Sequence, residues 1–440
     1  MVAPLAQTNP APLQIQTHHE DMIHDAQMDF YGKRLATCSS DRTVKVFDVV
    51  EPSAVEPKYQ LVDTLRGHDG PVWQVSWAHP KFGSILASCS YDGKIFVWRE
   101  TSNGTGAVNQ RQAAWEKIKE HTLHSASVNS ISWAPHEYGP ILACASSDGK
   151  VSVLTFKDDG TWDAPLFVAH SIGCNAVSWA PPYLPTSLSS PAGGQQAASE
   201  PQKFATGGCD GLVKIWMLNP STQIWELSET LEGGHTDWVR DVAYSPSIGL
   251  ARTYLASAGQ DRVVNVWTQD GAKGSWKRHT LDPSGNGGKF NGPVWRVSWS
   301  IGGNVLAVTA GDGKVTLWKE NLKGRWAINS DVAVDEGKVW VSNPGNISNS
   351  FQFHPFHQLD APSISASWQQ NPHYFCRVSF PNNWNGQQQW PNAAIPRQPP
   401  NHVELFRLTS PPPSKYTNQQ GPSLINELGG RKYTLNSKVL

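Results

Sequence analysis

Histidine, serine and aspartate recur together along this chain in sets that resemble the parts of a hydrolase active site. His68, Ser88 and Asp92 supply the three side-chain types of a nucleophilic triad, and Ser257 and Asp261 follow His235 in the same way. In a triad, a histidine base activates the hydroxyl, and the carboxylate orients the base. An active site needs one such set in one cleft. The repetition of the set therefore argues for another role.

Alignment on the aspartate shows that these residue types recur at fixed offsets. The aspartates are Asp41, Asp92, Asp148, Asp210, Asp261 and Asp312, separated by 51, 56, 62, 51 and 51 residues. Four residues earlier stand Thr37, Ser88, Cys144, Thr206, Ser257 and Val308, and six residues later stand Phe47, Trp98, Leu154, Trp216, Trp267 and Trp318. The residue four positions before each repeat's first apolar strand is His19, His68, His124, His170, His235 and Phe290.

The fixed offsets favour a structural network over catalysis, because cysteine and valine replace the hydroxyl in two repeats. We interpret each aspartate as an acceptor for turn amides and for the histidine, whose second ring nitrogen reaches the hydroxyl and the indole beyond it. Such a network would lock the register of each repeat. Leu154 and Phe290 interrupt it in the third and sixth repeats, which we expect to depend more on apolar packing.

Neither a metal site nor a cofactor site is expected. The histidine pairs His18 with His19 and His354 with His357 have too few companions to bind a metal. Gly207-Gly208 is a lone pair in a strand and not a phosphate-binding loop. The sequence therefore predicts no catalytic, cofactor-binding or metal-binding residue.

The elements that carry these residues are short strands. Residues 67–98 contain two alternating apolar runs, an Asp92-Gly93 turn signal and a third apolar run. This pattern predicts antiparallel strands joined by tight turns. A fourth, outer strand is expected in each repeat, near residues 59–65, 115–122, 162–168, 224–231, 276–281 and 326–332. Repeats of this length with several strands each are typical of propeller blades.

Composition agrees with an all-β fold. The chain has 20 Trp, 32 Pro and 37 Gly, and Gly and Pro favour turns over helices. Lys and Arg number 36 against 37 Asp and Glu, so no net field indicates direct nucleic-acid binding. No run of about 18 apolar residues predicts a spanning helix, and the amino terminus resembles no signal peptide. The cysteines, which show no C-x-x-C pairing, are expected to be buried, reduced thiols: Cys38, Cys89, Cys144, Cys174, Cys209 and Cys376.

Several segments closely resemble one family, the Sec-thirteen type WD-repeat propellers shared by the COPII vesicle coat and the nuclear pore scaffold. They include SSDRTVKVFDV (39–49), GHDGPVWQVSWAHPKFGSILASCSYDGK (67–94), WAPHEYGPILACASSDGK (133–150), IGCNAVSWAP (172–181), DWVRDVAYSPSIGL (237–250) and NVLAVTAGDGKVTLWKE (304–320). The resemblance covers about residues 15–338. It implies an open six-bladed propeller that a partner completes by inserting one blade between blades one and six.

The resemblance also implies partners and locations. These partners are the α-solenoid outer-cage subunit of COPII and a nucleoporin of the Y-shaped pore complex, with a nutrient-signalling complex at the vacuole or lysosome as a third association. The locations are the cytoplasmic face of the endoplasmic reticulum, COPII vesicles and the nuclear pore, where the protein is peripheral to the membrane. Blade one (about 18–64) and blade six (about 290–332) are the candidate contact surfaces, and individual contact residues are not readable. An unpaired strand edge beside such a gap gives partner binding a physical motive.

The domain organisation predicted from the sequence has three parts. Residues 1–14 form an amino-terminal tail, residues 15–338 form the propeller, and residues 339–440, rich in Asn, Gln, Pro and Ser, form a mostly disordered tail. Two alternatives stay open for this tail. It is a wrongly assigned gene end, or its β-prone pieces at 373–380 and 402–408 make an extra blade.

Three rival functions stay open as well. One is a generic WD-repeat adaptor that binds peptides on a propeller face, and a second is a related propeller confined to the nuclear pore. An enzyme is the most distant alternative, and covalent labelling of Ser88 or Ser257 by a serine probe would support it. Capture of coat and pore solenoids by the protein would separate the scaffold from the generic adaptor.

Overall fold

The computed structural model describes residues 13–50, 58–102, 113–182, 201–246, 252–271, 274–285, 287–300, 302–335, 338–341, 373–378 and 402–408. In these residues the chain is all-β, as predicted, with two single-turn 3₁₀ helices, η1 (Pro80–Phe82) and η2 (His136–Tyr138). The boundaries predicted at residues 14 and 338 remain predictions.

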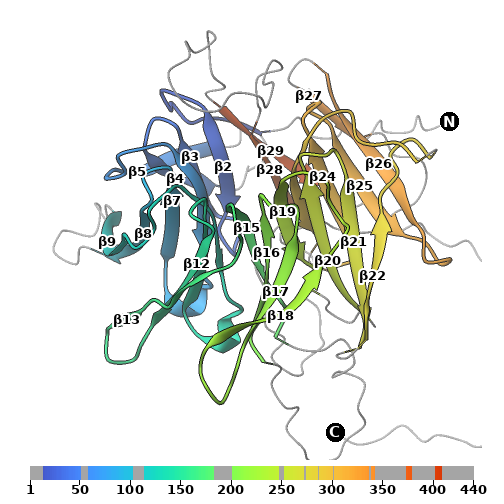
Figure 1. Cartoon of the computed structure of the whole chain (residues 1–440). Helices are drawn as coiled ribbons and strands as arrows, with labels where there is room; N and C mark the ends of the chain where they lie inside the picture. The colour runs from blue at the N-terminus through green and yellow to red at the C-terminus, as the bar shows by residue number, and fades with distance from the viewer. Residues whose placement is uncertain are drawn as a thin grey trace, which may run out of the picture. The chain divides into compact units, whose positions relative to one another are not determined.

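Six antiparallel sheets follow one another along the chain, and each is one blade (Figure 1). The strands of blades one to three are β2 (Ile23–Met28), β3 (Arg34–Ser39), β4 (Val44–Val50) and β5 (Lys58–Leu65); β6 (Val72–Trp77), β7 (Ile85–Ser90), β8 (Ile95–Ser102) and β9 (Ala113–His121); and β10 (Val128–Trp133), β11 (Ile141–Ser146), β12 (Lys150–Phe156), β13 (Trp162–Asp163) and β14 (Leu166–Val168). The predicted outer strand of blade three is thus divided into two short strands, both paired with β12.

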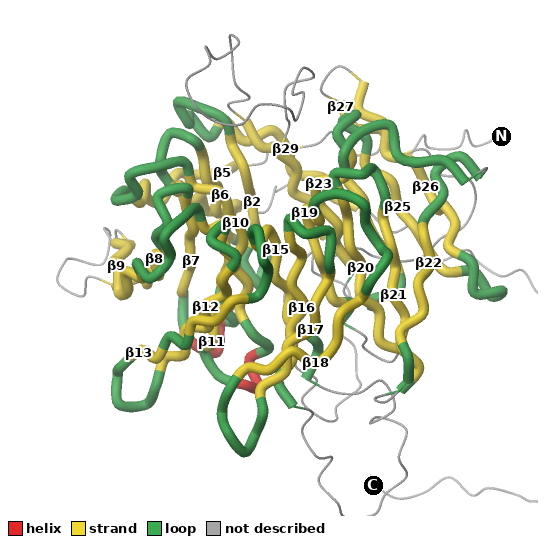
Figure 2. The backbone as a smooth tube through the Cα atoms, viewed as in Figure 1, coloured by secondary structure: helices red, strands yellow, loops and turns green. Residues whose placement is uncertain are grey.

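Blades four to six have the same order. Their strands are β15 (Cys174–Trp179), β16 (Lys203–Gly208), β17 (Val213–Leu218) and β18 (Trp225–Leu231); β19 (Val239–Tyr244), β20 (Arg252–Gly259), β21 (Val264–Asp270) and β22 (Trp276–Thr280); and β23 (Val294–Trp299), β24 (Val305–Ala310), β25 (Val315–Glu320), β26 (Trp326–Asp335) and β27 (Lys338–Val341). The inner strands β2, β6, β10, β15, β19 and β23 lie beside one another in that order (Figure 2).

The turn aspartates stabilise the tight turns between the second and third strands of the blades. In blade two, the backbone N–H of Lys94 donates to the carboxylate of Asp92 at 2.8 Å. Gly93 between them has φ +79°, a conformation that glycine adopts without steric cost. Arg42 and Arg262 take the same left-handed conformation in blades one and five, with φ of 69° and 66°. The turn geometry is therefore retained even where an L side chain opposes it.

A β-bulge interrupts every inner strand just after its first residue. In blade one the pairing register shifts between Ile23 and Asp25, and the other five blades shift at the equivalent place. A bulge bends a strand and re-aims its side chains. The residues that follow the six bulges are Asp25, Gln74, Ser130, Ala176, Asp241 and Arg296.

A further sheet joins the two ends of the described chain. Strand β1 (Leu13–Gln16) pairs with β29 (His402–Leu408), and β29 pairs with β28 (His373–Val378). Both carboxy-terminal strands fall in the region predicted to be mostly disordered, at the two β-prone pieces of the alternative interpretation. The other predictions for residues 342–440 lie outside the described residues.

Candidate functional site

In blade two the structure brings the predicted network residues together. Nδ1 of His68 lies 3.0 Å from a carboxylate oxygen of Asp92, and Nε2 lies 2.9 Å from Oγ of Ser88. The indole N–H of Trp98 donates to the same Oγ at 3.0 Å. Because a carboxylate only accepts hydrogen bonds, Nδ1 of His68 carries the proton and Nε2 accepts from the serine hydroxyl. The four side chains therefore form one satisfied chain of hydrogen bonds.

Blades one, four and five repeat this geometry with the predicted residues. His19 lies 2.7 Å from Asp41 and 2.9 Å from Thr37. In blade four, His170 lies 2.9 Å from Asp210 and 2.8 Å from Thr206. In blade five, His235 lies 3.2 Å from Asp261 and 2.8 Å from Ser257. Trp216 and Trp267 each donate to the hydroxyl of their blade at 3.0 Å, whereas Phe47 has no N–H to donate.

In blades three and six the contacts at these positions use residues that were not predicted from the sequence. In blade three, His124 lies 3.2 Å from Asp148, and the missing hydroxyl at Cys144 is replaced by Ser152, 2.8 Å from Nε2 of His124. Ser152 is the cross-strand partner of Cys144. The signal that could have found it is a hydroxyl residue directly opposite the substituted position.

Blade six follows the same rule on its third strand. Thr316 lies opposite Val308 and accepts the indole N–H of Trp318 at 2.8 Å. Asp312 accepts from the side chain of Asn291 at 3.3 Å and from the backbone of Lys314 at 3.1 Å. Asp312 and Trp318 therefore belong to separate contacts, because no histidine links them.

Burial of these hydroxyls argues against nucleophilic catalysis. Thr37, Ser88, Thr206 and Ser257 are 0 % exposed, so no substrate can reach them. Burial raises the pKa of Asp92, but the hydrogen bond and charge of His68 together with the hydrogen bonds from the turn amides outweigh it and lower the pKa of that carboxyl to about 2. The pKa of Asp41 likewise lies below its usual range, because the hydrogen bonds from His19 and Thr43 outweigh burial. The carboxylates stay charged as acceptors within the blades.

A second set of hydrogen bonds links one blade to the next through the residues that follow the bulges. In each case the side chain accepts a hydrogen bond from a backbone N–H of the following blade. The pairs are Asp25 with Val75 at 3.3 Å, Gln74 with Ile131 at 2.8 Å, Ser130 with Val177 at 3.4 Å, and Asp241 with Val297 at 2.9 Å. In blade four, where Ala176 has no acceptor, Ser178 accepts from Tyr244 at 3.0 Å. These residues were missed from the sequence, because the same inner strands contain other polar residues, such as His24 and Asn129. A signal that could have found the first four is their place two residues after the apolar residue that begins the strand.

Tryptophans at the ends of the inner strands add a parallel set of contacts. The indoles of Trp77, Trp133, Trp179 and Trp299 each donate to a backbone carbonyl of the preceding blade at 2.9–3.0 Å. The two sets of hydrogen bonds therefore fix each blade to its neighbour.

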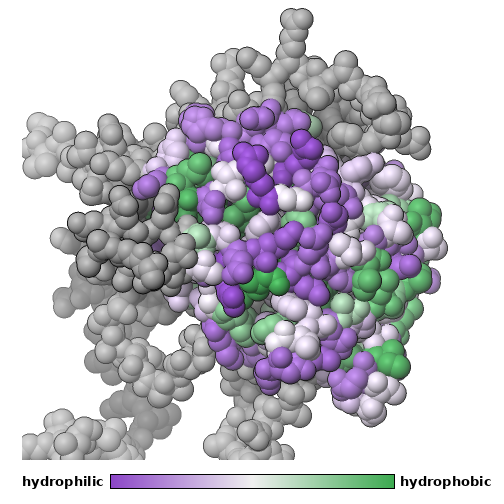
Figure 3. All heavy atoms as spheres, turned by 90° about the vertical axis from the view of Figure 1, so that its left-hand side faces the viewer, coloured by the Kyte–Doolittle hydropathy of each residue, from purple (hydrophilic) through white to green (hydrophobic). Residues whose placement is uncertain are grey.

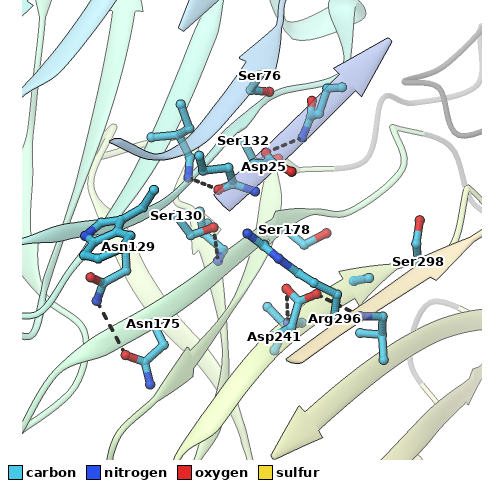
Figure 4. Close-up of a pocket in the computed structure, with 18 of the residues that line it drawn as sticks. Asp25, Ser76, Asn129, Ser130, Ser132, Asn175, Ser178, Asp241, Arg296 and Ser298 are labelled. Atoms are coloured by element: carbon cyan, nitrogen blue, oxygen red, sulfur yellow. Dashed lines mark hydrogen bonds between the residues drawn. The ribbon is translucent and has the colours of Figure 1, made fainter. Parts of the chain in front are cut away.

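The inner strands of all six blades line a channel of about 800 Å³. Arg296 points into it beside Asp241 (Figure 4). Burial lowers the pKa of Arg296, but the charges of Asp241 and Asp25 outweigh this and raise it. Burial also raises the pKa of Asp241, to about 6. Arg296 thus couples charges from blades one, five and six in one enclosed space.

Arginine breaks the pattern of inter-blade acceptors. Blades one, two, three and five present an acceptor after the bulge, whereas the guanidinium of Arg296 only donates. Blade six therefore cannot hold a following blade by this hydrogen bond.

The apolar clusters show the same interruption. Five clusters each combine residues from two successive blades, from the interface of blades one and two to that of blades five and six. The sixth cluster contains Ile23, Met28, Leu35, Phe47 and Val49 of blade one, with Ile15 of β1 as its only other fully buried member. Among the described residues, no cluster joins blade six to blade one.

Blade six has a corresponding face. Leu306 and Val308 of β24 pack toward blade five, so the alternate residues Ala307 and Thr309 point to the opposite face. Ala307, Thr309 and Val315 line the channel, which thus extends along this face beyond the inner strand. We call the apolar face of blade one around Leu35 and Phe47, together with this face of blade six, the terminal faces.

At the mouth of the channel, an arginine and two tryptophans form a cation–π stack. The guanidinium of Arg240 lies 4.9 Å from the ring centroids of both Trp238 and Trp295, and its Nε donates to Gln260 at 2.8 Å. Trp238 is 43 % exposed. This cation–π stack is the feature that a peptide-binding adaptor would use.

Other features of the described residues do not indicate a second binding site. On the face shown in Figure 3, hydrophilic residues predominate and hydrophobic ones form small separate groups. Within the described residues, no cluster of three or more His, Cys, Asp or Glu is placed to bind a metal, and no helix is long and apolar enough to cross a bilayer. The thiols of Cys38, Cys89, Cys144 and Cys174 are buried, which raises their pKa. The prediction of burial is wrong for Cys209, which follows β16 and is only partly buried.

Comparison with known proteins relates this geometry to other chains. The family described as WD domain, G-beta repeat matches residues 11–48, 59–99, 115–154, 225–268 and 283–319. A protein of Mycosarcoma maydis named "Protein transport protein SEC13" is 55% identical over 352 residues, covering 73% of this chain and 95% of that protein. Proteins of the same name from Cryptococcus neoformans and Emericella nidulans are each 53% identical, over 74% and 71% of this chain and 98% and 96% of their own lengths.

Proposed function

The chain belongs to the SEC13 family of WD-repeat proteins, and from this membership we propose that it is a structural subunit of the COPII vesicle coat and of the nuclear pore scaffold. Its relatives are named as protein transport proteins, and the identity extends over nearly their whole length. The function is mechanical, and the network hydroxyls are buried away from any substrate.

The proposed mode of action is insertion of a partner's blade between blades one and six. The two terminal faces support it, because within the described part of the chain neither of them packs against a complete four-stranded blade. Burying an apolar blade face stabilises by roughly 25 cal/mol for each Å² removed from water. A blade supplied by a partner would cover both faces at once and make a rigid vertex.

The expected partners are the COPII outer-cage α-solenoid subunit and a Y-complex nucleoporin, with the nutrient-signalling complex at the vacuole or lysosome as a further association. The corresponding locations are the endoplasmic reticulum, COPII vesicles and the nuclear envelope. The protein would reach these membranes peripherally, through its complexes.

Co-expression tests this proposal. The chain is produced with the outer-cage solenoid subunit, once intact and once with the inserting blade deleted. We expect a soluble complex with the intact subunit and none with the deleted form. Complex formation that survives the deletion would contradict insertion.

The generic adaptor remains the second candidate because of the Arg240 stack at the channel mouth. Arg240→Ala separates the two functions, since it removes the stack and leaves the terminal faces intact. A scaffold should capture the same coat and pore solenoids with and without this substitution. Loss of all captured proteins in the variant would favour the adaptor.

A further inference from the structure

Strand β1 occupies the position of an outer strand that has no blade of its own. Six residues separate the outer strand β5, which ends at Leu65, from the next inner strand, which begins at Val72, and the same interval follows β9. Strand β1 ends at Gln16 and is followed by the same interval before β2 at Ile23. Counted by the repeat, β1 is therefore the outer strand of a blade that would precede blade one.

Blade one anchors this strand. Ile15 is fully buried against the terminal face of blade one. The backbone N–H of Gln16 donates to the hydroxyl of Tyr59 on β5 at 3.0 Å. Lys45 donates to the backbone carbonyls of Thr17 and His18 at 3.1 Å and 2.6 Å. Strand β1 is thus fixed in place with an edge that needs a pairing strand.

The chain itself supplies that pairing strand. Strand β29 runs antiparallel to β1, with Leu13 opposite Leu405 and Gln16 opposite His402, and β28 extends the sheet. Strand β28 lies beside the inner strand β2, as the inner strands of successive blades lie beside one another. The position of the sheet next to β2 can be followed in Figure 1.

We propose that the two ends of this chain form an incomplete seventh blade, which occupies in cis the place that the partner's blade takes. The three strands cover the terminal face of blade one and satisfy the edge of β1. A partner's blade displaces β28 and β29, while β1 stays and pairs with the incoming strand. This competition rests on the function proposed above, whereas the cis blade itself does not.

The cis blade should weaken partner binding by a factor that can be measured. A segment of the same chain competes at an effective concentration in the millimolar range when its tether fits. The apparent partner affinity equals the intrinsic affinity multiplied by the fraction of molecules in which the cis blade is displaced. A cis blade that is closed in 90–99% of molecules, an order-of-magnitude range, weakens partner binding about ten- to hundredfold.

A disulfide across the pairing register tests the proposal in the full-length chain. Gln16→Cys combined with His402→Cys places two thiols on facing residues, within the range of a disulfide. The matched control combines Gln16→Cys with Arg407→Cys, five residues along β29, which is roughly 17 Å away at about 3.4 Å per residue. Peptide mapping without reductant reports the bond, and titration with purified outer-cage solenoid subunit reports binding.

We expect the facing pair to cross-link and the control pair not to do so. Oxidation of the facing pair should weaken solenoid binding at least tenfold, and reduction should restore it. Absence of the cross-link overturns the cis blade and leaves the proposed function intact. A cross-link with unchanged solenoid binding overturns the competition. If the unsubstituted chain also fails to bind the solenoid, the proposed function and the competition fail together, and the cross-link still decides whether the cis blade exists.

Discussion

Replacement of Asp92 by alanine should destabilise the propeller. Its carboxylate accepts from Nδ1 of His68 at 3.0 Å and from the backbone N–H groups of Asp69 and Lys94 at 2.9 and 2.8 Å. The side chain of Asp92 is 6% exposed and that of His68 is 2% exposed, so water cannot easily replace the lost acceptor. A buried donor without a partner costs about 1–3 kcal/mol, and the more exposed turn amides cost less. We expect a loss of about 3 kcal/mol in the free energy of unfolding.

The neighbouring Asp69 provides a matched control. Its side chain is 74% exposed and pairs with Lys94 at 2.8 Å, and such surface pairs contribute about 0–1 kcal/mol. Thermal unfolding at pH 7 should give Asp92→Ala a melting temperature roughly 5–10 °C below that of the unsubstituted protein, and Asp69→Ala one within about 2 °C of it. Urea unfolding measures the corresponding loss in the free energy of unfolding. Equal midpoints for the two variants would refute the view that the histidine network locks the blade.

Three other sets of substitutions test the remaining buried polar groups of the propeller. Ser152→Ala should cost about 1–2 kcal/mol in urea unfolding because it removes the hydroxyl bonded to buried His124, and an effect no larger than that of the exposed control Ser125→Ala would count against this compensation. Arg296→Leu should lower stability at pH 7.5 by about 1–3 kcal/mol, equivalent to one or two pKa units, because it removes the positive charge that favours the ionised form of buried Asp241. The loss should be smaller at pH 5.5, below the pKa of about 6 of Asp241. A deficit independent of pH would contradict the charge coupling. Burial lowers the pKa of His24 and His121 to about 4, so the stability they contribute is complete above pH 6.5 and is lost as the pH falls through 4. Over this range the melting temperature of the double variant His24→Gln/His121→Gln should fall less than that of the unsubstituted protein. An equal dependence of melting temperature on pH in the two proteins would refute the role of these histidines.

The blades could be predicted from the sequence because their signals are local. Period-two apolar runs and an aspartate at a tight turn define strands within about ten residues of chain. The sequence grouped His68, Ser88 and Asp92 through offsets that recur in blade after blade, and hydrogen bonds link these residues in blade two. Repetition thus supplied long-range information that one repeat alone would not contain.

The compensating and inter-blade residues could not be predicted in the same way. Ser152 replaces the hydroxyl at Cys144 only because the two residues face each other across strands. The charges of Arg296 and Asp25 interact only because blades distant in sequence line one channel. The pairing of β1 with β29 joins segments from opposite ends of the chain, and no local pattern determines such a register.

Site-specific photo-cross-linking tests whether a partner's blade inserts between blades one and six. A photoreactive amino acid is placed at Tyr59 beside β1 on blade one, at Leu317 opposite Ala307 on the terminal face of blade six, or at Phe156 on blade three as the control. In the complex with the outer-cage solenoid subunit, we expect cross-links from Tyr59 and Leu317 to the partner's inserted blade and none from Phe156. Cross-links from Phe156, with none from the other two positions, would contradict insertion between blades one and six.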